Sequence, residues 1–589
     1  MNTSLRSHTC GELRAEHIGQ TVTLCGWVQK NRDLGALLFF DLRDRHGLTQ
    51  VSIDSNSLPE MYEQARAFGR EFVLSVTGTV VERESKNPEM PTGNIEVRPT
   101  SIELVNKSEV PPFLIEDETD GGEELRLTYR YLDIRRPKVR DGLILRSKMM
   151  RAARQFLDGQ GFLEVETPFL IKSTPEGARD FVVPSRLHHG TFYALPQSPQ
   201  ILKQLLMVAG MDRYYQIVKC FRDEDFRGDR QPEFTQIDCE MSFVTQDDVL
   251  NTFEGFTKHV FKEVKGIELP DFKRMPYKEA IAKYGTDKPD LRFGCEIHEL
   301  NEAMSGTDFG VFNSIIDGDG LLAGIVAKGC AGYTRKQLDG LTNMVREMGG
   351  TGLVYCKMNE DGSVKSSVDK FYDADHWAKV AAQMGAEAGD LILIVADKLK
   401  GKTRKYLGNL RLHLGKTEGW IDTDMWSVFW VVDFPLFEED EETGELTFAH
   451  HPFCMPREGD LQYLDRDPQR VVAQSYDLIM NGNEIVSGSI RIHKPDVQAK
   501  IFDILGLDKA AQEEKFGFML KAFEYGAPPH GGCAFGFDRW AMLLAGESSI
   551  RDVIPFPKTS GGRDLMMDAP GGVPEENLAE LGVKLAEKG

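Results

Sequence analysis

The sequence lacks any apolar run long enough to cross a membrane. Its 589 residues are 41% hydrophobic and 28% charged, and no segment approaches the roughly 20 apolar residues that a transmembrane helix needs. The first residues, MNTSLRSHTCGELRAEHIG, also lack the apolar segment of a secretory signal. We therefore expect a cytoplasmic protein with no membrane role.

Paired cysteines and an excess of positive charge are also missing. The nine cysteines include no CxxC pair, which predicts neither a disulfide framework nor a structural zinc site. Acidic residues outnumber basic ones by 92 to 70, giving a net charge of −22. Such a chain does not coat nucleic acid indiscriminately, because phosphate binding needs local Lys and Arg density. A specific RNA partner stays open through local basic patches.

The chain is too long for one hydrophobic core, at a typical domain size of about 150 residues. Five short β-segments follow each other between residues 21 and 105, TVTLCGWVQ, ALLFFDLRD, LTQVSID, REFVLSVTGTVVE and NIEVRPTSIELV. Gly, Asp and Asn turn residues separate them. This pattern predicts a five-stranded oligonucleotide-binding barrel in residues 1–110.

Changes in composition and in the spacing of apolar residues divide the remaining chain. An acidic, turn-rich segment before YRYLDIRRP predicts a hinge, and LRSKMMRAARQFLDGQGF has the apolar spacing of a helix that runs into Gly161. Strands such as GLVYCK and LILIVA alternate with helix-like segments in the middle of the chain. We predict a hinge at 111–140, a first part of a larger domain at 141–289, an inserted α/β or α+β domain at 290–423 and a second part at 424–589.

The stretch CFRDEDFRGDRQPEFTQIDCEMSF, residues 220–243, concentrates arginines and carboxylates. A period of two places Phe234, Gln236, Asp238 and Glu240 on one face of a strand. In the preceding strand, YQIVKCFRDE, Arg222 and Glu224 likewise share a face. The two strands predict an antiparallel hairpin whose polar face suits a nucleotide, with guanidinium for phosphate and an aromatic ring for the base. A solvated hairpin whose charges pair with each other is the alternative.

Two further segments carry groups that suit a nucleotide. GGCAFGFDRWAMLLAG places glycines and Arg539 at the start of an apolar helix, where a phosphate is attracted, although a tightly packed glycine-rich strand explains the same letters. In YDLIMNGNEIVSGSIRIH, Asp477 and Glu484 could share Mg²⁺. Arg491 could clamp a carboxylate or make an ordinary ion pair.

Two motifs point elsewhere and are weaker. LILIVADKLKGKT resembles a strand that runs into a phosphate-binding loop, but Ala396 stands where that loop needs glycine. The segment HHPFC, with His450, His451 and Cys454, has no second ligand cluster nearby in sequence. Loop histidines therefore explain it better than zinc.

Taken in order, GFLEVETPFL with Pro168, FRDE with QPEFTQIDCE, and GFDR resemble the three signature motifs of class II aminoacyl-tRNA synthetases. A preceding oligonucleotide-binding barrel and an insertion between the second and third motifs are similar to the bacterial aspartyl enzymes of that class. The resemblance implies a multidomain α+β fold, with the catalytic domain built on an antiparallel sheet. It also implies a homodimer with the first motif at its interface.

The resemblance also implies three substrates, which are ATP, L-aspartate and tRNA-Asp. It gives each of the candidate residues above a role. Arg222 would meet the α-phosphate of ATP and the aspartate carboxylate, Glu224 the adenine amine, and Phe234 the adenine ring, while Arg539 would bind the far phosphate. Asp477 and Glu484 would hold Mg²⁺. The other implied ATP contacts are Asp223, Gln231, Gly536, Phe537 and Asp538.

Aspartate selection would follow from positive charge. By the family pattern Arg491 and Lys203 take the side-chain carboxylate, and asparagine would leave them without a counter-ion, which costs on the order of several kcal/mol. The remaining implied aspartate contacts are Glu176, Ser198, Gln200, Arg222, Asp238 and His450. The inserted domain is expected near the acceptor side of the tRNA, and we assign it no site.

The barrel would read the anticodon. Phe39 would stack on an unpaired base, Gln50 and Glu96 would read base edges, and Arg32 would contact a base or the backbone. Barrel core is the alternative for Phe39, but a period of two turns either Phe39 or Phe40 outward. Leu34 stands where dual-specificity family members tend to carry histidine, which favours strict use of tRNA-Asp. An enzyme that also charges tRNA-Asn, and an inactive paralogue that only binds RNA, are the competing hypotheses.

Overall fold

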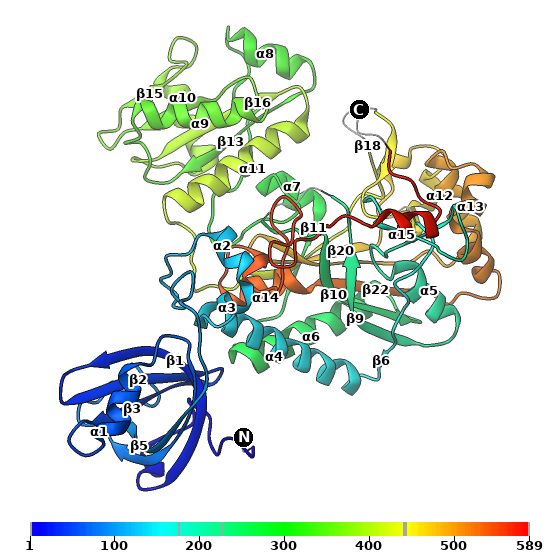
Figure 1. Cartoon of the computed structure of the whole chain (residues 1–589). Helices are drawn as coiled ribbons and strands as arrows, with labels where there is room; N and C mark the ends of the chain where they lie inside the picture. The colour runs from blue at the N-terminus through cyan, green and yellow to red at the C-terminus, as the bar shows by residue number, and fades with distance from the viewer. Residues whose placement is uncertain (1–2, 175–176, 225–227, 440–443, 587–589) are drawn as a thin grey trace. The chain divides into compact units, whose positions relative to one another are not determined.

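The computed structural model describes residues 3–174, 177–224, 228–439 and 444–586. Contacts divide the chain into two compact units, one of residues 1–147, 225–232 and 541–577 and the other of residues 148–224, 233–540 and 578–589. Figure 1 gives the elements along the whole chain. Each unit is described by itself below.

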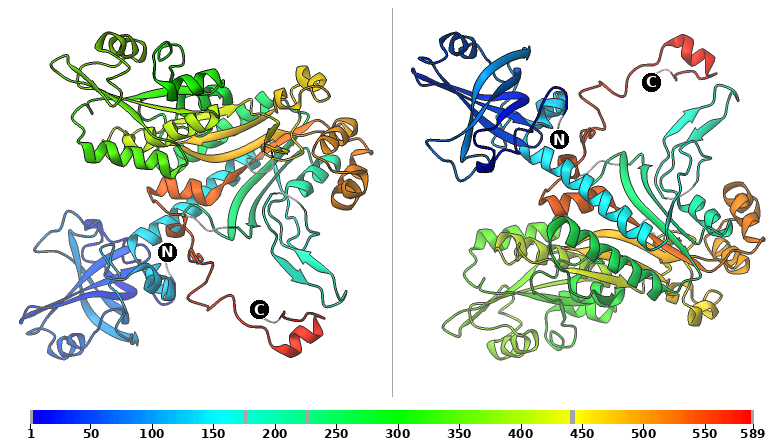
Figure 2. Two further views of the ribbon diagram at one scale, coloured as in Figure 1. Left: turned by 90° about the horizontal axis from the view of Figure 1, so that it is seen from above. Right: turned by 90° about the horizontal axis from the view of Figure 1, so that it is seen from below.

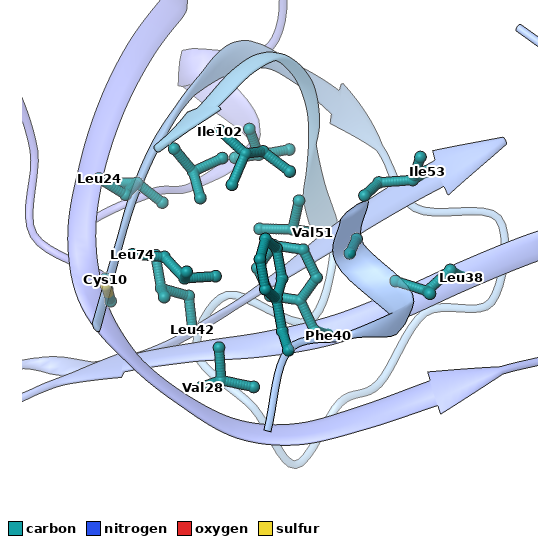
Figure 3. Packing of buried hydrophobic residues seen from close by; sticks show 14 of the residues in the cluster. Cys10, Leu24, Val28, Leu38, Phe40, Leu42, Val51, Ile53, Leu74 and Ile102 are labelled. Carbon is teal, nitrogen blue, oxygen red and sulfur yellow. The ribbon is translucent and has the colours of Figure 1, made fainter. Parts of the chain in front are cut away.

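The first unit contains a closed barrel with strand order β1-β2-β3-β5-β4, which confirms the predicted oligonucleotide-binding fold. Leu38, Phe40 and Leu42 are fully buried in the barrel core, while Phe39 between them is only half-buried. Figure 3 shows the core side chains pointing into the barrel. The strands are β1 (Thr21–Asp33), β2 (Leu37–Asp44), β3 (Gly47–Asp54), β4 (Val73–Glu82) and β5 (Ile95–Asn106).

The segment predicted as a hinge contains two short helices, α2 (Glu123–Thr128) and α3 (Arg130–Asp133). The carboxylate of Asp133 is fully buried and accepts from the guanidinium of Arg136 at 2.8 Å and from that of Arg130. Arg130 also donates to the carbonyl oxygens of Arg551 at 2.9 Å and Ile554 at 2.8 Å. These bonds tie the segment to residues 551–554, which belong to the same unit.

The second unit contains an eight-stranded sheet of order β11-β17-β20-β21-β22-β10-β9-β6. Its pairs are antiparallel except β11 with β17 and β6 with β9, as predicted for the catalytic domain. The strands are β6 (Leu163–Glu164), β9 (Arg213–Phe221), β10 (Glu233–Ser242), β11 (Lys273–Pro276), β17 (Val428–Val432), β20 (Ser475–Met480), β21 (Asn483–Ile490) and β22 (His530–Gly536).

Aromatic packing fixes α6 (Gln246–Lys265) against this sheet. The ring of Phe256 lies 4.8 Å from Phe535 of β22 and 5.9 Å from Trp540, centroid to centroid. Phe156 of α4 (Pro137–Gly159) lies 5.6 Å from Phe256 on its other side. Figure 2 shows α6 running along one face of the sheet. The opposite face is therefore free to carry polar side chains.

A five-stranded antiparallel sheet of order β12-β13-β16-β14-β15 forms between residues 298 and 397. Two apolar clusters cover its two faces, so β13 and β16 are buried on both sides, which explains continuous runs such as LILIVA. The elements are β12 (His298–Glu299), α8 (Gly310–Asp317), β13 (Leu321–Ala327), α9 (Arg335–Glu347), β14 (Val354–Met358), β15 (Val364–Ser366), α10 (Ala374–Met384), β16 (Leu391–Asp397) and α11 (Lys400–Thr417).

The smaller elements complete the described chain, in which no helix combines the length and apolar composition of a membrane crossing. They are η1 (Ala15–His17), α1 (Pro59–Arg66), β7 (Val182–Pro184), β8 (Phe192–Ala194), α5 (Gln200–Val208), α7 (Tyr277–Tyr284), β18 (Phe437–Glu439), β19 (Leu446–Phe448), η2 (Glu458–Tyr463), η3 (Pro468–Arg470), α12 (Pro495–Ile504), α13 (Lys509–Phe523), α14 (Phe537–Ala545), η4 (Ile550–Asp552) and α15 (Glu575–Glu580).

Candidate active site

The centre of the eight-stranded sheet carries a buried polar surface. Strand β10 pairs with β9 and β22, with Glu240 opposite Gly532 and Asp238 opposite Ala534. A Cβ on Gly532 would lie 2.1 Å from the carbonyl oxygen of Cys239 and 2.3 Å from Glu240 Oε2. Glycine at 532 is therefore what lets the Glu240 carboxylate lie flat across β22.

Two cations meet the two carboxylates of β10. Lys203 Nζ from α5 lies 2.9 Å from Asp238 Oδ2 and 3.2 Å from Glu240 Oε2. Arg491, which directly follows β21, binds Glu240 in a bidentate manner, Nε to Oε1 at 2.9 Å and Nη2 to Oε2 at 3.1 Å. All four residues are at most 1% exposed. We call Lys203, Asp238, Glu240 and Arg491 the ion network.

The guanidinium of Arg491 uses all of its N–H groups. Besides Glu240, Nη2 donates to the carbonyl oxygen of Gly532 at 3.2 Å, and Nη1 donates to Ser489 Oγ and to His451 Nε2, both at 2.8 Å. Because arginine only donates, His451 Nε2 is the acceptor. A carboxylate that approaches Arg491 must therefore replace one of these acceptors.

Burial and charge set the protonation of the network. Burial raises the pKa of Asp238 to about 6, against the opposing effect of Lys203. Burial acts in the same sense on Glu240, but Arg491 and Lys203 outweigh it and lower the pKa of that carboxyl. Burial and the charge of Arg491 hold the pKa of His451 well below its usual value, so the ring is neutral. The network therefore carries two cations and two carboxylates at neutral pH.

A second polar region lies on β20 and β21. A cavity of about 300 Å³ is lined by Asp477, Glu484, His450, Tyr277, Asp287, Phe434, Pro435, Glu438, Ala449 and Ser487. His450 Nε2 lies 3.4 Å from Asp477 Oδ1, and the other ring nitrogen, Nδ1, is buried without a hydrogen-bond partner among the described residues. Four carboxylates face this space, which we call the carboxylate cavity.

The cavity concentrates negative charge. Burial, and then the charge of Asp477, raise the pKa of Glu484, although Arg539 opposes this. Burial lowers the pKa of His450, but the Asp477 carboxylate outweighs it and the net pKa is raised. No group of three or more His, Cys, Asp or Glu side chains is arranged for a metal within the described ranges. Asp477 and Glu484 are carboxylates, the ligand type that hard cations prefer, and with only two of them a cation would need further ligands from a substrate or water.

The hairpin is antiparallel as predicted, with Phe221 opposite Glu233. The prediction that Arg222 and Glu224 share a strand face is wrong, because β9 ends at Phe221 and Asp223 instead bridges to Arg179. The Arg222 Cζ lies 5.0 Å from the centroid of the Phe234 ring, and Arg222 Nε is buried with no hydrogen-bond partner in the described chain. Glu224 follows, half-buried.

The strand-to-helix turn at Gly536 joins the cavity to β10. Arg539 Nη1 donates to the carbonyl oxygen of Glu484 at 2.7 Å, and Asp538 Oδ2 accepts from the backbone N–H of Thr235 at 2.7 Å. Phe537 between them is fully buried. Gly536, Phe537, Asp538 and Arg539 thus lie where β22 ends and α14 begins.

The other predicted contacts are more dispersed. Ser198 Oγ accepts from the backbone N–H of Gln200 at 3.2 Å, at the start of the helix that carries Lys203. Gln231 belongs to the first unit, where its side chain exchanges two hydrogen bonds with the backbone of Lys558, at 3.0 and 2.7 Å. Glu176 lies outside the described residues.

The predicted RNA contacts gather on the outer face of the barrel. Arg32 on β1 is opposite Phe39 on β2, and its guanidinium binds Asp41 in a bidentate manner at 2.9 Å. Gln50 accepts from Arg32 at 3.1 Å and donates to Glu96 at 2.8 Å. Leu34 lies just beyond these residues and is 71% exposed.

Sequence reasoning left four participants without a role. Glu240 was on the predicted polar face without a partner, and Arg491 and Lys203 supply it. His451 was treated as a loop histidine, yet it accepts from Arg491. Asp41 and Ser52 complete the barrel surface, Ser52 Oγ donating to Glu96 at 2.7 Å. Strand alternation would have identified both residues, because Asp41 lies two positions after Phe39 and Ser52 two positions after Gln50.

Comparisons with known proteins agree with this geometry. A family model described as tRNA synthetases class II (D, K and N) matches residues 122–560, and one described as OB-fold nucleic acid binding domain matches residues 22–105. An aspartate–tRNA ligase of Porphyromonas gingivalis is 55% identical over 584 residues, covering 98% of this chain and 99% of that protein. That of Flavobacterium psychrophilum is 53% identical over 586 residues, covering 98% and 99%.

Two solved structures share the fold. Asparaginyl-tRNA synthetase from Pyrococcus horikoshii, complexed with asparaginyl-adenylate, aligns with a TM-score of 0.59 at 19% identity and covers 94% of this chain and 98% of that one. A putative aspartyl-tRNA synthetase from Leishmania major aligns with a TM-score of 0.60 at 20% identity, covering 94% of each chain. At these identities the likeness is one of fold alone.

Proposed function

The chain belongs to the class II tRNA synthetases of the aspartate, lysine and asparagine group, and on that premise we propose that it is an aspartate–tRNA ligase. It activates L-aspartate with ATP and transfers the aspartyl group to the 3′ end of tRNA-Asp. The observation that carries the proposal is the buried pair of cations, Lys203 and Arg491, at the centre of the sheet.

The side-chain carboxylate of aspartate binds Arg491 and Lys203. Its charge replaces the neutral acceptor His451 on Arg491 Nη1, so the incoming anion meets a donor that is already oriented by Glu240. The expectation that asparagine leaves these cations without a counter-ion is wrong, because Asp238 and Glu240 already pair with them. Asparagine is instead disfavoured because its neutral amide oxygen is a weaker acceptor for the Arg491 and Lys203 donors than a carboxylate is. The difference is on the order of several kcal/mol, which suffices for selection without editing.

The ammonium group of aspartate needs acceptors. Asp238 Oδ1 is buried without a hydrogen-bond partner among the described residues, while Oδ2 holds Lys203. An unsatisfied carboxylate oxygen in a polar site is a position for a substrate donor. Ser198 and Gln200, at the start of α5, and Glu176 are the remaining proposed contacts near this end of the substrate.

ATP lies across the hairpin and the turn at Gly536. Arg222 Nε is also unsatisfied and contacts the α-phosphate and the aspartate α-carboxylate, while Phe234 stacks on the adenine. Arg539, at the start of α14, binds the far phosphate. The other proposed contacts are Asp223, Glu224, Gln231, Gly536, Phe537 and Asp538.

Asp477 and Glu484 are the residues that would hold Mg²⁺. Burial, and then the charge of Asp477, raise the pKa of Glu484, and a divalent cation would oppose both effects. When bound with ATP, Mg²⁺ supplies charge neutralisation for the phosphates and the leaving pyrophosphate.

Activation is an in-line displacement. The α-carboxylate of aspartate attacks the α-phosphorus of ATP, a carboxyl–phosphate bond forms, and the bond to pyrophosphate breaks. Arg222 stabilises the charge that develops on the α-phosphate. The 3′-hydroxyl of the terminal adenosine of tRNA then attacks the aspartyl carbonyl and AMP leaves. No protein nucleophile takes part, and the chain contributes positioning and electrostatics.

The barrel face of Arg32, Phe39, Gln50 and Glu96 reads the anticodon. Phe39 presents a half-buried ring beside Arg32, which Asp41 holds, and beside the hydrogen-bonded pair of Gln50 and Glu96. Such a surface stacks one base and contacts the edges of others. Leu34 favours strict use of tRNA-Asp over a dual specificity that includes tRNA-Asn.

Two further properties follow for the assembly and its place in the cell. Leu163, Phe169 and Leu170 of the first motif are 45–53% exposed, which supports a homodimer that covers them. The nine cysteines in the described chain are free, which supports a reducing, cytoplasmic setting.

The test is aspartate-dependent exchange between ATP and pyrophosphate, followed by charging of purified tRNA-Asp and tRNA-Asn. We expect exchange with aspartate but not asparagine, and charging of tRNA-Asp alone. Equal charging rates for the two tRNAs would contradict the strict specificity. Absence of exchange would contradict the proposed activity, and the inactive paralogue would then be the better hypothesis.

A further inference from the structure

We propose that the exposed face of α11 binds the phosphate backbone of the tRNA; this inference rests on the proposed function. Residues 398–417 contain seven Lys and Arg residues and no Asp or Glu, in a chain with 92 acidic and 70 basic residues. Solvated helix faces ordinarily mix both signs of charge. A polyanion that binds a protein of net charge −22 needs such a local concentration of cations.

Three of these seven cations form one stripe with two other polar residues. Lys402, Lys405, Asn409, His413 and Lys416 follow each other at spacings of three or four residues and are exposed or half-exposed. Residues at this spacing lie on the same side of a helix. From Lys402 to Lys416 the stripe spans about 21 Å, at the rise of about 1.5 Å per residue. We call it the α11 stripe.

The inner side of α11 fixes the direction of the stripe. Tyr406, Leu407, Leu410 and Leu414 are buried in the apolar cluster under the five-stranded sheet. Arg411 is 2% exposed, donates to the carbonyl oxygens of Asp290, Phe293 and Cys295 at 2.7–3.0 Å, and lies 4.0 Å from the Phe293 ring. The helix cannot turn its lysines inward.

Helix stability does not account for the lysines at the start of α11, although Lys416 in the last turn suits the helix dipole. The first turn of α11 has no acidic residue, yet cations at a helix N-terminus oppose the helix dipole. Lys400 pairs with Asp319 and Arg404 with Glu299, but none of Lys402, Lys405 and Lys416 has an ion pair in the described part of the chain. Their charge is thus available to an external anion.

The same observations resolve the GKT motif. The loop between β16 and α11 is only Lys398 and Leu399, and Thr403 Oγ is turned inward, donating to the carbonyl oxygen of Leu321 at 3.0 Å. A mononucleotide loop needs a longer, glycine-rich turn and an available hydroxyl group. An extended backbone of spaced phosphates fits the stripe better than a single nucleotide does.

The test compares two triple variants of the full chain. K402Q/K405Q/K416Q removes the α11 stripe, and K365Q/K370Q/K379Q removes three exposed lysines of the same inserted segment that lie among Asp361, Asp369, Asp373 and Asp375. Both lose three positive charges. Binding of tRNA-Asp is measured by fluorescence anisotropy across a KCl series, with aspartate-dependent ATP–pyrophosphate exchange as the check on folding and the active site.

We expect the stripe variant to bind tRNA-Asp about tenfold more weakly at 0.1 M salt and the slope of log K against log salt to become shallower by about 2 to 3. Exchange stays at the wild-type rate, and the control variant keeps wild-type binding. A wild-type slope in the stripe variant, or an equal loss in both variants, would overturn the proposal. Lack of exchange in the wild type would instead refute the proposed function.

Discussion

The ion network and the carboxylate cavity lie on the same sheet and treat charge in opposite ways. In the network two cations and two carboxylates are buried together, and every N–H of Arg491 is occupied. In the cavity four carboxylates meet around open space, and burial, followed by the charge of Asp477, raises the pKa of Glu484. The network is balanced before substrate arrives, whereas the cavity is balanced only by what it binds.

The difference teaches how one sheet can recognise both an anion and a cation. A balanced network selects an anion by exchange, because the ligand must be a better acceptor than the group it displaces. A cavity with excess negative charge attracts a cation by charge alone. The carboxylates that bind the cation therefore destabilise the fold when the cavity is empty. Four substitutions, taken from the largest expected effect to the smallest, test this contrast.

Arg491→Leu should break the network. We expect loss of aspartate activation by at least about a thousandfold and a destabilisation of about 3 kcal/mol, because Glu240 loses its bidentate partner in a buried site. Exchange kinetics and urea unfolding measure the two effects. Arg457→Leu, which removes an exposed partner of Asp433, is the control and should cost less than about 1 kcal/mol. Retained activation would remove Arg491 from the pocket.

Asp477→Asn should lower activity without lowering stability, in contrast to Arg491→Leu. We expect exchange to fall about a hundredfold and to require more Mg²⁺, since a metal-binding carboxylate is lost. The free energy of unfolding should stay the same or rise, because repulsion between Asp477 and Glu484 is relieved. Exchange titrated with Mg²⁺ measures the loss of activity and the Mg²⁺ requirement. Asp424→Asn, at an exposed position, should change neither quantity, and an unaltered Mg²⁺ requirement in Asp477→Asn would contradict the metal assignment.

His451→Leu tests the exchange of acceptors on Arg491. The empty enzyme would keep a buried N–H without an acceptor, which costs about 1 kcal/mol, and the aspartate carboxylate would satisfy it. We therefore expect a lower thermal midpoint together with a KM for aspartate reduced about fivefold. His451→Gln, which retains an acceptor, should resemble the wild type. A raised KM in His451→Leu would mean that the ring itself contacts the substrate.

The smallest effect concerns pH. Because burial and Asp477 raise the folded-state pKa of Glu484, its contribution to stability is present below the unfolded pKa and is lost as pH rises through the folded value. Glu484→Gln does not titrate. In EDTA, the thermal midpoint of Glu484→Gln minus that of the wild type should therefore increase as the pH rises from 4 to 7.5. A pH-independent difference would show that Glu484 ionises without cost.

The barrel and the hairpin follow closely from the sequence. Alternation predicted that one of Phe39 and Phe40 points outward, and the structure buries Phe40 and leaves Phe39 half-buried. The five strands begin and end within a few residues of their turn signals. The ion network could not be predicted from local pattern. Glu240 and Arg491 lie far apart in the chain, and the pairing of β10 with β22 and of β22 with β21 brings them together. Lys203 joins them because α5 packs against β10.

The inserted domain shows the other limit. Its buried strands were recognisable as apolar runs, but which side of α11 faces solvent depended on the packing of Tyr406, Leu410 and Arg411. The end of β9 was also missed, because the bridge between Arg179 and Asp223 takes the chain away from β10. Tertiary contacts decided both points.

Gly532 shows how a residue without a side chain can behave as if it were catalytic. Any substituent there would collide with the carbonyl oxygen of Cys239 and with Glu240, and would push the carboxylate away from Arg491. In a saturation-mutagenesis screen we expect position 532 to tolerate no replacement, as strictly as Arg491. A map of intolerance would therefore mark Gly532 as part of the active site although it offers the substrate no functional group.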